Sequence, residues 1–154
     1  MSVVLPDRPG FYALVWEIVK QVPAGRVTTF SQVASMIPPP EGVKAEDYAK
    51  LGARWVGDAL NRVSLVDEPT IPWHRVINVR GTSSLPENSE GAALQRGRLR
   101  ADGVMPADSE TVDLAVYGWE GPDAAWLAQR DLLPPKPIRS PSADTDSPSQ
   151  MRLF

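Results

Sequence analysis

The segment Pro72-Trp73-His74-Arg75-Val76 gathers the side chains of this sequence that are best suited to chemistry or binding. His74 is the only histidine in the chain, and its imidazole is the side chain whose ordinary pKa lies nearest to neutral pH. A serine hydrolase would need this imidazole as its base, with a nucleophile such as Ser83 or Ser84 and a carboxylate such as Asp67. No Gly-x-Ser-x-Gly sequence supports that arrangement, which favours a hydrogen-bonded structural role for His74.

Trp73 stands between a proline and this histidine, and two interpretations of its role are open. A buried indole usually finds a partner for its N–H group, so Trp73 could be an ordinary core residue. Pro69 and Pro72 nevertheless stiffen the chain that leads to this bulky ring. Such rigidity is typical of the wall of a binding pocket.

Composition excludes several other kinds of site. The chain has no cysteine, which removes disulfides, thiolate metal sites and cysteine nucleophiles, and a single histidine leaves mainly carboxylates without EF-hand spacing. Neither the Gly-x-x-x-x-Gly-Lys-Ser/Thr nor the Gly-x-Gly-x-x-Gly pattern of phosphate-binding loops occurs. We therefore expect no metal and no cofactor. No apolar run approaches the roughly 18 residues of a membrane span, so we expect a soluble, cytoplasmic protein with no membrane contact.

The charge distribution is uneven along the chain. The formal net charge is -3, which argues against a nonspecific nucleic-acid binder held by a large positive field. Residues 50–100 are nevertheless net positive, and seven of their eight cations are arginine, the side chain suited to phosphates and base edges. The alternative is a normally solvated surface.

Apolar periodicity predicts three helices before this segment. Residues 9–21 have the spacing of an amphipathic helix. Thr29 and Gln32 have the spacing of a capping box at the start of a short helix, which Pro38 would stop. A third helix over 49–63 has an apolar side and a polar side, the latter formed by Arg54, Asp58 and Asn61. A short helix, a long connection over 38–47 and a longer helix suggest a helix-turn-helix.

The second half of the chain predicts fewer elements. Residues 75–78 have the character of a short extended segment that ends at Gly81. Residues 89–103 predict a helix capped by Ser89 and closed by Gly103. The alternation of Val112, Leu114 and Val116 with polar or small residues predicts a half-buried strand, which could be a wing.

These elements together predict a mainly α fold, namely a winged helix-turn-helix domain over residues 1–133 with a short β-hairpin. Residues 134–154 are rich in proline and serine and have too few apolar side chains to offset the entropy of ordering. We expect this tail to be flexible.

Four blocks of the sequence resemble a known family. ALVWEIVKQVPAGRVTTFSQVASMI, ARWVGDALNRV, IPWHRVINVRG and LQRGRLRADGV follow in the order of the C-terminal, DNA-binding domain of O6-alkylguanine-DNA alkyltransferases, over roughly residues 11–119. Those enzymes carry a nucleophilic cysteine in a Pro-Cys-His-Arg-Val motif. Trp73 stands in its place here, which is similar to the alkyltransferase-like proteins that bind alkylated guanine without repairing it.

The resemblance implies roles for individual residues. Arg54 matches the family's arginine finger, whose stem fills the vacancy left by a flipped base; the alternative is an ordinary surface arginine. Phe30 matches a tyrosine that crowds the phosphate of the flipped nucleotide, without its hydroxyl; the alternative is a hydrophobic staple. Trp73 would then form the pocket floor, where stacking contributes about 1–3 kcal/mol per base. His74 has no thiol to deprotonate and would keep a structural bond, while Arg75 and Asn78 would hold the loop.

Three departures from the family's pattern stand out. The connection over 38–47 is longer than usual. Relatives place an arginine over the flipped base where this chain has Pro86, so that Arg80 or Arg96 would have to reach in to supply a cation. The family's enzymes often add an N-terminal domain, which we do not expect here, and this chain instead adds the tail over 134–154. The predicted DNA-binding and lesion-pocket residues are Phe30, Arg54, Trp73, Arg75, Asn78 and Arg80, with His74 structural.

The function that the resemblance implies is a non-enzymatic DNA damage sensor. As a monomer, it would bind double-stranded DNA that contains O6-alkylguanine from the minor groove, flip the lesion, bend the duplex and mark it for nucleotide excision repair proteins. The strongest alternative is a winged-helix transcriptional regulator that reads DNA sequence in the major groove. A hydrolase based on His74 is the remaining one.

Overall fold

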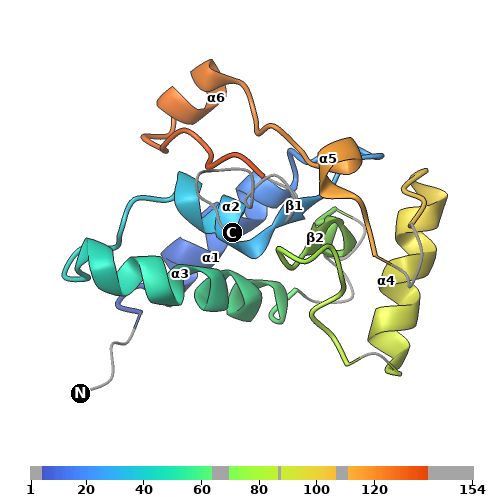
Figure 1. Ribbon diagram of the computed structural model, residues 1–154. Helices are drawn as coiled ribbons and strands as arrows, with labels where there is room; N and C mark the ends of the chain where they lie inside the picture. Colours follow the sequence, from blue (N-terminus) through green and yellow to red (C-terminus); the bar gives the residue numbers. More distant parts are fainter. Residues whose placement is uncertain (1–4, 64–69, 87, 107–110, 139–154) are drawn as a thin grey trace, which may run out of the picture.

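The computed structural model describes residues 5–63, 70–86, 88–106 and 111–138. Its elements are α1 (Arg8–Val19), β1 (Thr28–Thr29), α2 (Phe30–Met36), α3 (Ala45–Leu60), the 3-10 turn η1 (Trp73–Arg75), β2 (Val76–Ile77), α4 (Glu90–Ala101), α5 (Leu114–Tyr117) and α6 (Ala124–Ala128). Figure 1 shows α1, α2 and α3 gathered on one side of the short strands and α4 on the other. The predicted mainly α fold is thus confirmed in outline. Within these ranges no helix is both long and apolar enough to cross a bilayer.

Helix α1 forms where the apolar spacing predicts it. Its first turn is closed by Asp7, whose side chain accepts a hydrogen bond from the Gly10 N–H group, and proline occupies the first turn, where no donor is needed. Phe11, Val15 and Ile18 are buried on its inner face. They anchor the main hydrophobic cluster, which α1 shares with α2 and α3.

Helix α2 has half of the predicted capping box. The Thr29 side chain accepts a hydrogen bond from the Gln32 N–H group at 3.0 Å, as predicted. The Gln32 side chain does not return to Thr29. It is buried and donates instead to the carbonyl groups of Trp119 at 2.9 Å and Lys136 at 3.2 Å. This glutamine therefore joins α2 to the last described part of the chain.

Helix α3 begins at Ala45, one turn earlier than the periodicity predicts. Glu46 and Asp47 lie in its first turn, where carboxylates stabilise the helix dipole. Tyr48 is buried and its hydroxyl donates to the Ala34 carbonyl of α2 at 2.8 Å. At Gly52 an added Cβ would lie only 3.0 Å from the Ala34 side chain, so glycine lets α2 and α3 pack closely.

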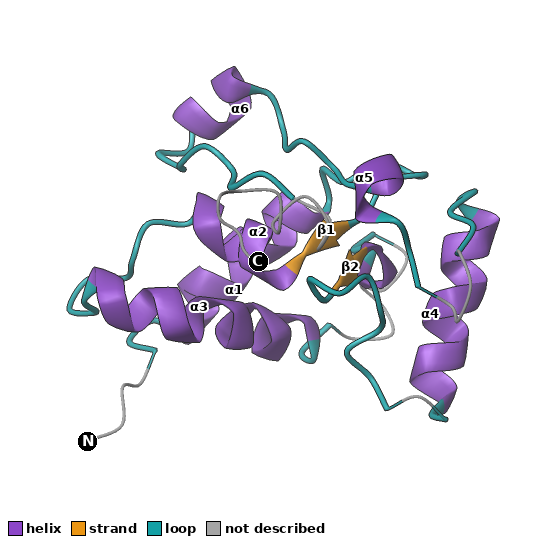
Figure 2. Ribbon diagram, viewed as in Figure 1, coloured by secondary structure: helices purple, strands orange, loops and turns teal. Residues whose placement is uncertain are grey.

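The two strands pair in parallel, which corrects the expectation of a β-hairpin (Figure 2). Thr28 lies opposite Val76, and Thr29 opposite Ile77. Parallel strands need a long crossover connection, and here α2, α3 and the chain after them supply it. The small sheet therefore joins two segments that are far apart in the sequence.

The strand predicted around Val112, Leu114 and Val116 is wrong. The Asp113 side chain accepts a hydrogen bond from the Ala115 N–H group at 2.9 Å and caps the short helix α5. Val112 and Leu114 are buried in a second hydrophobic cluster with Leu99 of α4, but Val116 is 55% exposed. The apolar alternation thus reflects a turn that buries two of its three side chains.

Residues 134–138, which the sequence assigns to a flexible tail, lie against α2. The Leu133 N–H group donates to the Met36 carbonyl at 2.8 Å, and the Lys136 N–H group donates to Ser35 Oγ at 2.9 Å. Ile138 packs against the second hydrophobic cluster. The rest of the predicted tail, residues 139–154, lies outside the described residues.

Candidate functional site

Trp73 is presented by the 3-10 turn η1, immediately before β2. Pro72 caps this turn: its carbonyl accepts a hydrogen bond from the Arg75 N–H group at 3.0 Å. The neighbours Ile71 and His74 are buried, whereas Trp73 itself is half-buried. The turn therefore directs the indole away from the core.

The half-buried indole borders an open pocket of about 450 Å³. This volume lies in the usual range of roughly 300–1,000 Å³ for ligand sites. The pocket lies between the last turns of α3 and the first turns of α4, and none of its described lining residues is charged. Its walls are formed by Phe30, Gly57, Leu60, Asn61, Val63, Trp73, Val76, Ser84, Leu85, Leu94 and Gln95.

Phe30 brings α2 to the pocket. It is the first residue of α2 and is half-buried, with one side packed on the main hydrophobic cluster. An added Cβ at Gly57 of α3 would lie 3.8 Å from the Phe30 ring, so a glycine keeps this wall open. Phe30 thus serves the packing of α2 and also lines the pocket beside Trp73.

Arg54 is exposed on α3 and does not line the pocket. Arg54 lies one helical turn before Gly57, which lines the pocket. Residues three apart lie on the same side of a helix, so Arg54 and Gly57 share one side of α3. The structure therefore places this guanidinium on the surface of α3 at the side where the pocket begins.

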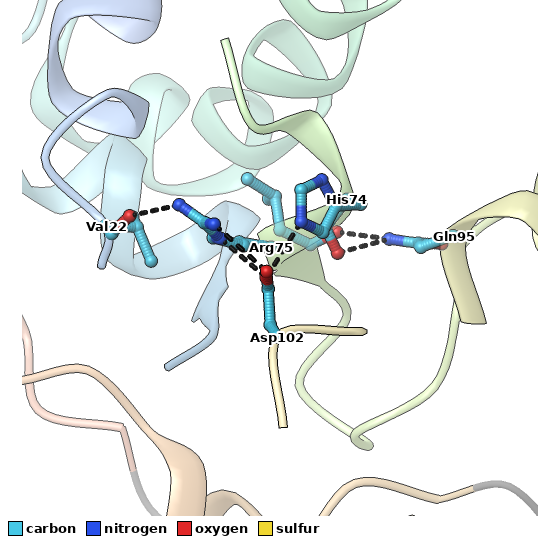
Figure 3. Close-up of polar contacts among 6 residues, drawn as sticks. Val22, His74, Arg75, Gln95 and Asp102 are labelled. Carbon is cyan, nitrogen blue, oxygen red and sulfur yellow. Dashed lines mark hydrogen bonds and ion pairs between the residues drawn. The ribbon is translucent and has the colours of Figure 1, made fainter. Parts of the chain in front are cut away.

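A polar network fastens the turn that carries Trp73 to the end of α4 (Figure 3). His74 is buried, and its Nε2 atom lies 2.9 Å from Asp102 Oδ2. Arg75 donates to both oxygens of the same carboxylate, at 2.8 and 3.1 Å, and to the Val22 carbonyl at 2.8 Å. The guanidinium of Arg75 is thus directed into the protein and away from the pocket.

Gln95 of α4 fastens the same turn from the other side. Its side-chain amide donates to the carbonyl groups of His74 at 3.2 Å and Val76 at 3.0 Å. The Ser83 hydroxyl donates to the Gln95 side-chain oxygen at 2.5 Å. Ser83 therefore bonds to Gln95, which is not the arrangement that a hydrolase would need, and Asp67 lies outside the described residues.

The electrostatics of the network favour an ionised Asp102 and a neutral His74. The hydrogen bond from Arg75 holds the pKa of the Asp102 carboxyl below its usual value. Burial lowers the pKa of His74 and outweighs the opposing effect of Asp102. Its Nδ1 atom is buried with no hydrogen-bond partner in the described part of the chain. In these ranges no three His, Cys, Asp or Glu side chains are grouped so that they could hold a metal ion.

Asn78 and Arg80 lie in a tight turn after β2. The Asn78 side-chain oxygen accepts hydrogen bonds from the N–H groups of Arg80 at 2.9 Å and Thr82 at 3.1 Å. Gly81 has a φ of +85°, and an added Cβ there would collide with the Val112 carbonyl. Asn78 thus shapes the turn and Arg80 is exposed on it, and neither lines the pocket.

Several residues near Trp73 are missing from the sequence-based set. Leu94 and Gln95 line the pocket, and Asp102 anchors the turn. The guanidinium carbon of Arg98 lies 5.8 Å from the centroid of the Trp73 ring. The spacing of Leu94, Gln95 and Arg98 places them on one face of α4, which Asp102 caps at its C-terminal end, and that periodicity was the available signal. Pro86 is exposed beside the lining residue Leu85.

Comparisons with known proteins agree on one family. Residues 10–104 match the family model described as 6-O-methylguanine DNA methyltransferase, DNA binding domain. A DNA base-flipping protein of Escherichia coli (strain K12) is 42% identical over 107 residues, which cover 68% of this chain and 70% of the relative. Alkyltransferase-like protein 1 of Schizosaccharomyces pombe is 34% identical over 116 residues, which cover 75% of this chain and 94% of the relative.

The fold is also similar to that of a solved structure. The crystal structure of S. pombe Atl1 in complex with damaged DNA containing O6-carboxymethylguanine matches with a TM-score of 0.55 and 30% sequence identity. The match covers 77% of this chain and 98% of that chain.

Proposed function

Because this chain belongs to the alkyltransferase-like proteins, within the family of the 6-O-methylguanine DNA methyltransferase DNA-binding domain, we propose that it recognises damaged DNA. In this proposal an O6-alkylguanine leaves the base stack of duplex DNA and enters the pocket beside Trp73. One observation carries it: the half-buried indole borders an open, uncharged pocket of about 450 Å³. Stacking on an aromatic ring contributes about 1–3 kcal/mol per base.

The protein would hold the lesion without repairing it. An indole carbon or nitrogen does not accept an alkyl group as a thiolate does, and the chain has no cysteine. The contact of His74 with Asp102 supports a structural role for this imidazole, because it orients the turn.

The mode of docking follows from where the cations lie. We propose that α2 and α3 act as a helix-turn-helix, with α3 directed to the minor groove. Arg54 is exposed one turn before the pocket wall, where its side chain could fill the space left by the flipped base. Arg80 would contact a phosphate from its exposed turn, while Arg75 and Asn78 hold the loop.

The bound complex would act as a signal. A monomer that keeps a flipped base and a bent duplex in place presents a distortion that nucleotide excision repair proteins can find. We propose that the protein acts in this way on cellular DNA in the cytoplasm.

The direct test compares two duplexes that differ in one O6-methyl group, at one stated salt concentration. We expect tighter binding of the O6-methylguanine duplex, and equal affinities would reject lesion recognition. Trp73→Ala should weaken lesion binding by about 1–3 kcal/mol and leave binding of unmodified DNA unchanged. Trp126→Ala, which removes a half-buried indole from α6, is the matched control and should keep the lesion preference. Enrichment of one sequence motif from random unmodified duplexes would instead favour a transcriptional regulator.

A further inference from the structure

We propose that Asn61 distinguishes O6-alkylguanine from guanine at the edge of the flipped base, because alkylation changes which groups on that edge donate hydrogen bonds. This inference rests on the proposed function, since it concerns how the pocket beside Trp73 selects the lesion. It assigns the selection to a side chain at the end of α3 that is absent from the sequence-based set of pocket residues.

The wall of the pocket offers few polar side chains. Among its described lining residues only Asn61, Ser84 and Gln95 are polar, and the others are aromatic, aliphatic or glycine. Gln95 is already engaged: its amide nitrogen donates to two backbone carbonyl groups, and its oxygen accepts from the Ser83 hydroxyl. Within the described ranges, neither Asn61 nor Ser84 makes a side-chain hydrogen bond. These two side chains are therefore available to a ligand.

Asn61 stands at the border of the pocket, where α3 ends. It follows Leu60, the last residue of that helix, and both Leu60 and Val63 also line the pocket. A base that stacks on the Trp73 indole has one face covered, so its polar edge meets the surrounding walls. Because Asn61 is exposed, its carboxamide can turn toward that edge without breaking an existing bond.

A purine in this pocket needs hydrogen-bonding partners for its edge. Outside the base stack it has lost the partners on its paired base, and a polar group that is buried without a partner is costly. The Ser84 hydroxyl can donate or accept, so it fits either form of the base. The Asn61 carboxamide has a donor and an acceptor side by side, so it fits a base edge that presents an acceptor next to a donor.

Alkylation at O6 creates that complementary edge. In guanine, the N1–H group and the N2 amino group are both donors. An O6-alkylguanine has no proton on N1, so that N1 becomes an acceptor while N2 still donates. The Asn61 carboxamide can then donate to N1 and accept from N2, just as an asparagine bonds bidentately to the N7 and N6 atoms of adenine. With guanine, the amide N–H group would face the N1–H group, and one of the two bonds is lost.

The first experiment measures Kd for duplexes that contain guanine or O6-methylguanine at one position, at one salt concentration. The informative quantity is the selectivity, which is the Kd of the guanine duplex divided by the Kd of the lesion duplex. We expect Asn61→Ala to lower the selectivity about fivefold, since one hydrogen bond contributes about 1 kcal/mol. Asn61→Asp should lower it further, because a carboxylate accepts from both donors of guanine and has no donor for N1 of the lesion.

A third duplex, which contains O6-methylhypoxanthine, tests the contact with N2. This base keeps the acceptor at N1 and lacks the N2 amino group. The unsubstituted protein should bind it about fivefold more weakly than O6-methylguanine, whereas Asn61→Ala should bind the two lesions equally. An unsubstituted protein that binds both lesions equally would overturn the assignment of N2 to Asn61.

Asn88→Asp is the matched control, because it introduces the same charge at an exposed position that does not line the pocket. It should weaken binding of all three duplexes alike and leave the selectivity unchanged. If the unsubstituted protein prefers the O6-methylguanine duplex but both Asn61 variants keep the full selectivity, this inference is overturned and the proposed function stands. Equal binding of guanine and O6-methylguanine by the unsubstituted protein overturns both.

Discussion

Arg75 donates two hydrogen bonds to the carboxylate of Asp102, from Nε to Oδ2 at 2.8 Å and from Nη2 to Oδ1 at 3.1 Å. The pair joins the turn that presents Trp73 to the C-terminal end of α4, since Asp102 follows the last residue of that helix. Bidentate arginine–carboxylate pairs are strong and geometrically specific. The position of the indole therefore depends on a contact between two distant parts of the sequence.

Asp102→Asn should destabilise the fold. The variant loses the ionised partner of Arg75, and a hydrogen bond to a charged group contributes roughly 1.5–3 kcal/mol. We expect the free energy of unfolding in urea to fall by about 2 kcal/mol. Asp123→Asn removes an exposed carboxylate whose side chain makes no capping hydrogen bond, and it should change stability by less than about 0.5 kcal/mol. Equal losses in the two variants would contradict the role of the pair.

Stability should fall in two steps as the pH is lowered. Burial holds the folded-state pKa of His74 below its ordinary value of 6.5, so the unfolded chain binds a proton more readily near that pH. Stability is therefore fully present above pH 6.5 and declines as pH falls through it. The folded-state pKa of Asp102 lies below its ordinary value of 3.8, because Arg75 binds the ionised form. That contribution is present above pH 3.8 and is lost as pH falls further, through the folded-state pKa.

Urea unfolding between pH 8 and pH 3 separates these steps. His74→Gln should remove the step near pH 6.5 and keep the acidic one. A profile of the unsubstituted protein that stays flat between about pH 7.5 and 5.5 would contradict the depressed pKa of His74.

Arg54→Ala should reduce the preference for lesion DNA more than general DNA binding. The side chain is exposed one turn before the pocket, where it would replace the flipped base. Lys50→Ala removes another exposed cation from α3, four residues earlier, and serves as the control. We expect a similar loss of affinity for unmodified DNA in both variants, about 1 kcal/mol or less each. The fluorescence of a 2-aminopurine beside the lesion reports flipping, and unchanged flipping in Arg54→Ala would argue against an inserted finger.

A chain that ends at Leu133 should be less stable than one that ends at Ile138. The shorter chain loses the hydrogen bond from Gln32 to the Lys136 carbonyl, the bond from the Lys136 N–H group to Ser35, and the packing of Ile138. We expect a difference of about 1–2 kcal/mol in the free energy of unfolding. Identical unfolding curves for the two chains would show that residues 134–138 contribute nothing to α2.

Local patterns in the sequence were sufficient for α1, α2 and α4 and for the N-terminal caps of α2 and α4. The apolar spacing of α1, the hydrogen bond from Gln32 to Thr29, and the Ser89 cap of α4 each depend on residues within a few positions of one another. The motif around Trp73 and the order of the blocks around it were sufficient for the family. Such local contacts can be inferred from the sequence, because residues that are close in the chain are also close in space.

The pairing of distant segments was decided only by the tertiary structure. The parallel pairing of β1 with β2 replaced the expected hairpin, and the Asp113 cap turned the expected strand into α5. The contact of Arg98 with the Trp73 ring and the hydrogen bond from Arg75 to Asp102 also join residues more than twenty positions apart. No periodicity encodes such contacts, because they form when burial of two hydrophobic clusters brings the helices together and polar groups there must find partners.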